Sequence, residues 1–168
     1  MLSMHAISIS PLLRALTNLS SILKKGEAYA ISKQIEPSVL LNSRLIADMY
    51  PLIKQVQIAT DMSKGAAARL SGTEIPKYED NESTFDELQA RITKTIAFLE
   101  SVDAALFDGS ESKQVTITIR NIDIQFTGLD YLLKWVMPNV YFHITTTYDI
   151  LRENGVELGK SDYLGPRK

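Results

Sequence analysis

Two histidines are the side chains of this sequence best suited to acid–base or metal chemistry, and their surroundings differ. His5 lies near the N-terminus among small and polar residues, and we interpret it as a surface residue because chain ends are usually poorly constrained. His143 lies in the most aromatic part of the chain. A buried neutral imidazole there could bind a metal through one nitrogen or act as a general base. It could equally be a core histidine that hydrogen-bonds a threonine or a backbone carbonyl.

Asp48 is the carboxylate that could complete a site with His143. It lies beside Met49 in an apolar stretch, just ahead of Pro51. Across a helical bundle it could pair with the imidazole. It could also cap a helix that restarts at Pro51, because aspartate is favoured just outside a first turn. Both interpretations stay open. Gln55 lies one turn beyond this break and could either add a polar group to a shared pocket or face solvent.

The residues before His143 suggest the walls of such a pocket. Asn139 precedes the histidine by four residues, so a helix would carry both on one face, and Trp135 belongs to the same aromatic helix. Aromatic walls with a few convergent polar groups are typical of small-molecule pockets. We therefore predict an interior ligand pocket formed by Asp48, Gln55, Trp135, Asn139 and His143. His143 and Asp48 are the candidate metal ligands.

The composition excludes several other kinds of site. The chain contains no cysteine, which removes disulfides and thiolate ligands, and its net charge of -2 gives no footprint for nucleic acid. No apolar run approaches the roughly 20 residues that cross a bilayer, and the N-terminus lacks the pattern of a signal peptide. We expect a cytoplasmic protein with no membrane partner. Its 168 residues are typical of one domain, predicted over 1–168.

Apolar residues at steps of three and four predict most of the elements as helices. One series predicts a helix over 11–32, with residues 4–9 as either its helical start or an extended arm. A second series predicts a helix over 45–70, with a kink or fresh start at Pro51 because proline lacks an N–H. Residues 72–83 form a connection, and Thr84 with Glu87 fits a capping box that opens a third helix to about residue 102.

The last third of the sequence changes period and then returns to helix. Apolar and polar residues alternate over 115–126, which predicts a β-hairpin that turns at Arg120 and Asn121. A fourth, aromatic helix follows over 127–154, with a bend at Pro138 and a stop at Gly155. The tail over 156–168 is expected to cross the surface. The sequence thus predicts an all-α fold of four long helices, with one small hairpin inserted before the last.

Several segments of the sequence together resemble a known family. They are Pro-Leu-Leu-Arg-Ala-Leu-Thr-Asn-Leu from Pro11, Asp-Met-Tyr-Pro-Leu from Asp48, Gln-Val-Gln-Ile-Ala from Gln55, Phe-Thr-Gly-Leu-Asp-Tyr-Leu from Phe126, and Tyr-Phe-His-Ile-Thr-Thr-Thr-Tyr-Asp-Ile-Leu-Arg from Tyr141. Over nearly its whole length the chain resembles the domain of unknown function 1993 family, a branch of the DinB-like superfamily. The resemblance implies an up-down-down-up four-helix bundle and frequent homodimers.

The resemblance also implies a metal site that this chain has partly lost. Many superfamily members hold a divalent metal with three histidines, and some of these are thiol-dependent transferases or isomerases. The last two ligands form an H-x-x-x-H pair ahead of a Leu-Arg-x-x-Gly ending, which Leu151 to Gly155 match here. Counting back from Gly155 puts His143 at one ligand position and Asn139 at the other. The second helix offers only Asp48 or Gln55, so we expect a degenerate site and no zinc or nickel.

Three functions follow from these residues. The first is a DinB-like domain that binds a small ligand in the polar pocket around His143. The second is a metal-dependent hydrolase or a thiol-transferase-like enzyme that uses His143 and Asp48, either to hold a zinc or nickel ion or as a base with its orienting acid. The third is a structural dimerisation module with no ligand.

Overall fold

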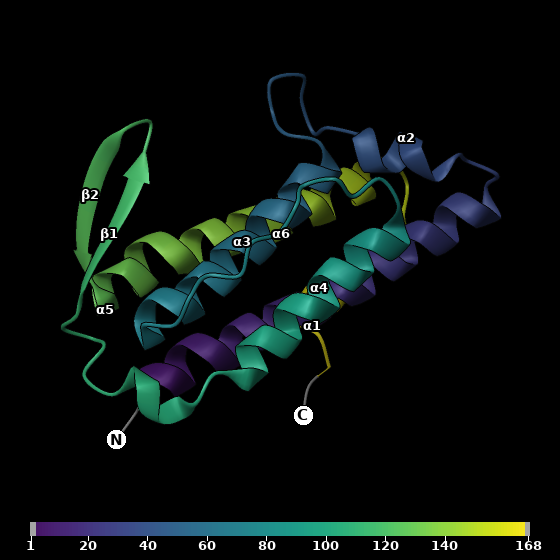
Figure 1. Ribbon diagram of the computed structural model, residues 1–168. Helices are drawn as coiled ribbons and strands as arrows, with labels where there is room; N and C mark the ends of the chain where they lie inside the picture. Colours follow the sequence, from purple (N-terminus) through teal and green to yellow (C-terminus); the bar gives the residue numbers. More distant parts are fainter. Residues whose placement is uncertain (1–2, 167–168) are drawn as a thin grey trace.

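The computed structural model describes residues 3–166 as a mostly helical fold with one antiparallel hairpin (Figure 1). The long helices are α1 (Met4–Ser32), α3 (Leu52–Ser71), α4 (Phe85–Ser101) and α6 (Met137–Glu153). The shorter segments are α2 (Pro37–Asn42), the 3-10 turn η1 (Ala104–Phe107), α5 (Gly128–Asp130), the π-helical turn η2 (Tyr131–Val136) and α7 (Lys160–Leu164). The strands are β1 (Gln114–Ile119) and β2 (Ile122–Thr127). The predicted helical fold and its hairpin are confirmed.

Helix α1 begins at Met4, so the helical start is the correct alternative for residues 4–9. Ser3 caps it, since its Oγ accepts the Ala6 N–H at 3.2 Å. Pro11 therefore lies inside the helix rather than at its first turn. Within residues 3–166, α1 is the one helix long and apolar enough to cross a membrane. Its apolar stripe is buried in the bundle, as in the core helix of a soluble protein.

The fresh start is the correct alternative at Pro51, because α3 starts at Leu52, but residues 43–51 are not helical, so the helix predicted from Leu45 does not form before it. Proline disfavours helical geometry in the residue before it, which ends any helix at Tyr50. The segment folds on itself instead. Arg44 donates to the Met49 carbonyl at 2.5 Å, and the Leu52 N–H donates to the Ser43 carbonyl at 3.0 Å. The apolar residues of this stretch consequently stay largely in solvent, with Ile46 61% exposed.

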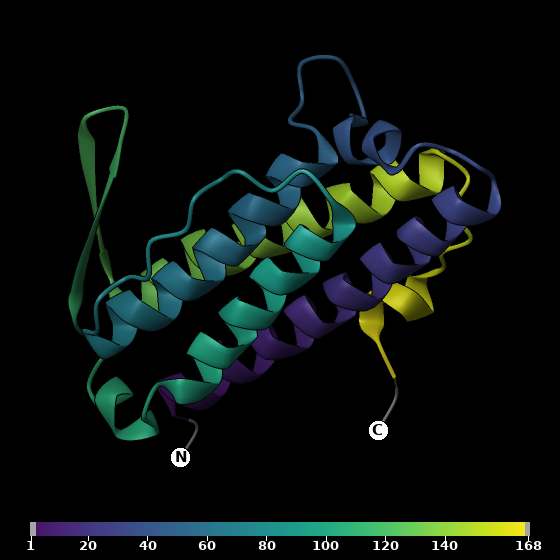
Figure 2. The same cartoon turned by 45° about the vertical axis from the view of Figure 1, so that its right-hand side comes forward.

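The long helices surround one core. Helix α3 packs against α4 and α6, and α1 packs against α4 and α6 from the other side. The predicted leucine stripe of α1, from Leu12 to Leu23, is fully buried against these neighbours. Figures 1 and 2 show the segment over residues 72–84 running back along α3 to the start of α4. The predicted capping box opens α4, where Thr84 Oγ accepts the Glu87 N–H and the Glu87 carboxylate accepts the Thr84 N–H.

The hairpin turns where the sequence predicts, at Arg120 and Asn121. Both residues have positive φ, at 50° and 65°, and Ile119 pairs with Ile122 across the turn. A two-residue turn with both φ positive matches the twist of antiparallel strands. Figure 1 shows the ribbon projecting from the end of the bundle where α5 begins. Val115 and Ile117 are buried at its base, which ties the ribbon to the helices.

The last helix is continuous from Gly128 to Glu153 and contains a π-helical turn before Pro138. The Met137 N–H bonds the Leu132 carbonyl, five residues back. Such turns widen a helix locally and are common near functional sites. The predicted stop at Gly155 is confirmed by its φ of 91°. In the tail, α7 is a short helix that packs on α1, where the sequence indicated only a surface segment.

Candidate functional site

The centre of the candidate site is a hydrogen bond between α6 and α3. His143 Nδ1 lies 2.6 Å from Gln55 Oε1, and the two side chains are 9% and 1% exposed. The Gln55 Nε2 donates to the Tyr50 carbonyl at 2.9 Å, which orients the amide oxygen toward the ring. The imidazole must then carry its proton on Nδ1 and donate it to Gln55.

This tautomer leaves the other ring nitrogen, Nε2, as an acceptor. Within residues 3–166 no group forms a hydrogen bond with Nε2. The polar side-chain atoms of this range that are both fully buried and unpaired are Tyr78 Oη and Ser110 Oγ, and Nε2 is not one of them. Nε2 therefore reaches solvent. Burial lowers the pKa of His143, so the ring is neutral at physiological pH. The Thr147 hydroxyl donates to the His143 carbonyl at 2.9 Å, inside the same helix.

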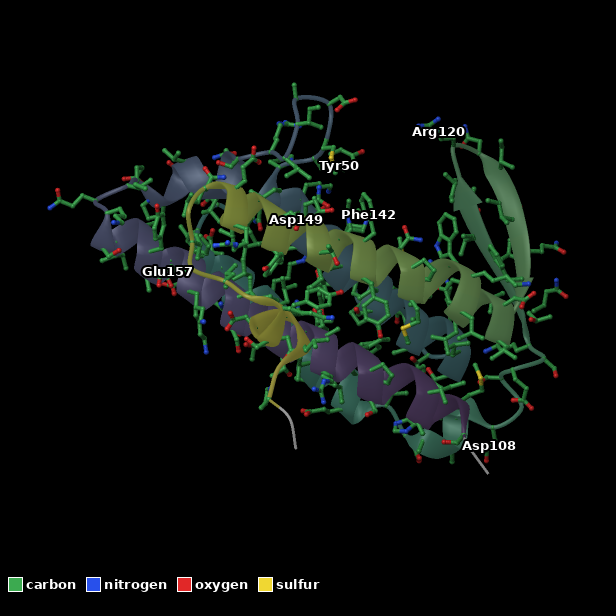
Figure 3. All side chains as sticks on the ribbon, turned by 180° about the vertical axis from the view of Figure 1, so that it is seen from behind. Tyr50, Asp108, Arg120, Phe142, Asp149 and Glu157 are labelled. Atoms are coloured by element: carbon green, nitrogen blue, oxygen red, sulfur yellow. The ribbon has the colours of Figure 1, made fainter. Side chains whose placement is uncertain are left out.

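Two exposed aromatic residues are connected to this centre, Phe142 through its ring and Tyr50 through its backbone carbonyl. The Phe142 ring packs edge-on against the His143 ring with centroids 5.3 Å apart, and 55% of Phe142 is exposed. Tyr50, whose carbonyl holds Gln55, is 57% exposed. Figure 3 shows Tyr50 and Phe142 on the same side of the molecule, above α6. Phe142 is thus an exposed aromatic neighbour of a nearly buried imidazole.

The remaining predicted site residues do not join this centre. Asp48 lies in the exposed turn before Pro51, and within the described residues it forms no hydrogen bond or ion pair with His143. Asn139 donates to the Trp135 carbonyl at 2.7 Å, inside its own helix. Trp135 packs on Phe126 of the hairpin and lines a separate cavity of about 300 Å³. The structure therefore brings together Gln55 and His143 from the predicted set.

The residues at this centre do not fit a divalent metal. The described part of the chain contains no group of three or more histidine, cysteine, aspartate or glutamate side chains that could hold one. The Gln55 oxygen already accepts from the imidazole, and the Asn139 amide nitrogen is bonded within its helix. One imidazole nitrogen with amide oxygens is a weak donor set for zinc or nickel, which prefer several imidazole, thiolate or carboxylate ligands.

A buried charge network elsewhere in the bundle was missed by the sequence analysis. Arg91 of α4 has a 2% exposed side chain and contacts three carboxylates, with Asp61 at 2.7 Å, Glu82 at 2.9 Å and Asp80 at 3.1 Å. Burial alone would lower the pKa of Arg91, but the Glu82 hydrogen bond and the neighbouring carboxylates raise it. The network joins the 72–84 segment to α3 and α4. Asp61 lies 30 residues before Arg91, and Glu82 lies 9 residues before it in a segment without helical period, so no local pattern indicates the network.

The comparisons agree with this description of the fold. The family model described as "Domain of unknown function (DUF1993)" matches residues 4–164. A crystal structure of a DinB family member protein from Shewanella denitrificans is 42% identical, with a TM-score of 0.91, over 97% of this chain and 92% of that one. No curated protein matches the chain. The chain therefore belongs to the DUF1993 family and has a DinB-like fold.

Proposed function

We propose that this protein is a DinB-like domain that binds a small ligand at His143 without a metal. The ligand donates a hydrogen bond to His143 Nε2 and packs an apolar or aromatic part on Phe142 and Tyr50. The observation that carries the proposal is the bond from Nδ1 to Gln55, because it commits the ring to the tautomer whose Nε2 accepts. A nearly buried acceptor without a protein partner gains most from a ligand that supplies the missing donor.

The bundle supports this site by holding its two helices in register. We infer that α1, α3, α4 and α6 form an up-down-down-up four-helix bundle, which the return of residues 72–84 along α3 supports. In that arrangement α3 and α6 are packed neighbours, and Gln55 and His143 meet across their interface. Pairing of His143 with Asp48, as the enzyme hypothesis requires, has no comparable contact in its favour.

Phenol and anisole form a matched pair of probes for the site. Both carry one aromatic ring, but only phenol has the hydroxyl that can donate to Nε2. We expect phenol to shift the ¹⁵N resonances of the His143 ring in NMR titrations, and anisole to bind at least tenfold more weakly. His143→Gln and Phe142→Ala should each weaken phenol binding. Leu133→Ala, which removes another exposed apolar side chain of the last helix, should not.

Two results would contradict the proposal. One is equal binding of phenol and anisole, or phenol binding that survives His143→Gln. The other is near-stoichiometric zinc, nickel or iron in protein purified without chelator, lost in the His143→Gln variant. The second result would restore the metal hypothesis, with ligands that the described residues do not supply.

A further inference from the structure

A cleft lies on another face of α6, lined by Tyr141 and Ile144 of that helix and not by His143. It measures about 630 Å³ and lies between α1, α6 and α7. Its apolar walls come from Pro11, Ala15, Ile144 and Leu164, and two phenol rings, Tyr141 and Tyr163, complete it. This volume is within the range of small-molecule sites, and such a lining suits an apolar body.

The charge at the mouth of this cleft comes from Arg14. Its Nε and Nη2 donate to the Leu164 carbonyl at 3.1 and 2.7 Å, and Nη2 also donates to the Pro166 carbonyl at 3.2 Å. These acceptors are neutral, and over residues 3–166 Arg14 has no carboxylate partner. Its Nη1 donors are unused in the same range. The guanidinium is thus held in position, and no carboxylate of residues 3–166 pairs with its charge.

A second, more polar cleft begins at the same arginine. It measures about 750 Å³ and shares Arg14, Asn18 and Leu164 with the first. Lys160, Ser161 and Asp162 add polar groups, and the Asp162 carboxylate is paired with Lys25 at 2.6 Å. The Asn18 side chain is buried and donates to the Tyr163 carbonyl at 2.9 Å, which fixes α7 between the two clefts. An elongated ligand could therefore lie with its apolar part in the first cleft and its charged end at the junction.

We propose that the α1–α6–α7 cleft binds an apolar monocarboxylate, a molecule with a hydrocarbon or aromatic body and one carboxylate. The carboxylate pairs with the Arg14 guanidinium and accepts hydrogen bonds from its unused Nη1 donors, and the body packs between Ala15, Ile144 and Tyr141. Burial and the nearby Tyr163 raise the pKa of Tyr141, so its hydroxyl stays protonated and adds no competing negative charge. This site is independent of His143, which faces α3 from the other side of α6.

Octanoate, 1-octanol and acetate separate the contributions of body and charge. In calorimetric and NMR titrations of the full chain, we expect octanoate to bind with one-to-one stoichiometry and to shift the resonances of Ala15 and Ile144. 1-Octanol lacks the charge and acetate lacks the body, so both should bind at least tenfold more weakly. Octanoate binding should also weaken as salt is raised, because the arginine is exposed.

Two variants test the two halves of the site. Arg14→Gln should weaken octanoate binding about tenfold and leave 1-octanol binding unchanged. Ala15→Leu narrows the cleft but keeps the charge, so it should weaken both ligands. Arg44→Gln removes another exposed arginine, which bonds the Met49 carbonyl, and should bind octanoate as the native chain does. The proposal would be overturned if Arg14→Gln bound octanoate as tightly as the native chain does, or if octanoate shifted only resonances outside the cleft. Circular dichroism checks that each variant is folded.

Discussion

At the scale of single residues, the chemistry of His143 follows from one amide. Gln55 accepts the Nδ1 proton at 2.6 Å and is itself oriented by the Tyr50 carbonyl. A carboxylate in the same position would favour the charged ring, whereas the neutral amide leaves burial as the dominant influence and lowers its pKa. The site is therefore poised to accept hydrogen bonds at neutral pH rather than to carry a positive charge.

The lowered pKa of His143 predicts a specific dependence of stability on pH. Because the folded-state pKa lies below the unfolded value of about 6.5, protonation favours the unfolded chain. The contribution of His143 to the free energy of unfolding is fully present above pH about 6.5, the pKa in the unfolded chain. It is lost as the pH falls through the lower pKa of the folded state. In urea titrations between pH 7 and 5, the free energy of unfolding should decrease less for His143→Gln than for the native chain. Parallel curves for the two proteins would show that this imidazole is not shielded from protons.

Changing Gln55 tests the hydrogen bond itself. Gln55→Leu leaves the Nδ1 proton and the Tyr50 carbonyl without their partner, which should cost about 1–3 kcal/mol of unfolding free energy. Gln55→Glu loses the donor to the Tyr50 carbonyl but keeps an acceptor for Nδ1 and adds a negative charge, so the pKa of His143 should rise in NMR titrations. A Glu variant with an unchanged histidine pKa would mean that the side chains do not meet in solution.

At the scale of elements, the charge network of Arg91 attaches the 72–84 segment to the helices on either side. Arg91→Ala would remove the cation from Glu82, whose side chain is 10% exposed and still accepts from the Gln57 amide, and would take away the Nε–H donor that the buried Thr60 hydroxyl accepts. We expect the free energy of unfolding, measured by chemical denaturation, to fall by about 3 kcal/mol. This value is at the lower end of the range for a broken buried ion pair, because Asp61 and Asp80 remain partly hydrated. Lys134→Ala removes an exposed pair with Asp130 and should cost less than about 1 kcal/mol. Similar losses in both variants would contradict a special role for Arg91.

The hairpin turn offers a gain in stability. Arg120 and Asn121 both have positive φ, which costs a residue with a side chain more than it costs glycine. Asn followed by Gly is the preferred pair for this turn, so the double change Arg120→Asn and Asn121→Gly should raise the unfolding free energy by up to about 1 kcal/mol. Asn121→Val should lower it. Calorimetric melting of both variants measures the difference, and a destabilised Asn-Gly turn would indicate that the Arg120 side chain has a role of its own.

At the scale of the whole molecule, the hairpin, the η1 region and the last helix meet at Gly128. A Cβ atom at Gly128 would lie 1.9 Å from the Ser110 carbonyl oxygen, a backbone atom that cannot move alone. Gly128→Ala should therefore cost about 1–3 kcal/mol and shift NMR resonances on both sides of the junction. Gly159→Ala, where the nearest side-chain atom would lie 3.7 Å away, should change stability by less than about 0.5 kcal/mol. Equal melting temperatures for the two variants would contradict this account.

The sequence alone determined the local elements. Period, capping and turn residues indicate α4 from Thr84, the hairpin about Arg120, and the stop at Gly155, because each depends on contacts between neighbours in the chain. The same local reasoning overextended the second helix to Leu45. There an apolar series continues across Pro51, but the loop over residues 43–51 closes on itself through Arg44 instead.

Tertiary structure decided which side chains meet. The sequence predicted Asp48 as the partner of His143 and Gln55 only as a further polar group of the pocket, whereas the register of α3 against α6 places the amide beside the ring. The cleft at Arg14 depends on backbone carbonyls about 150 residues away in the chain, and α7 must fold back before that cleft exists. Periodicity identifies the buried face of a helix, but the partners across an interface depend on the offset between helices, which side-chain packing over the whole core determines.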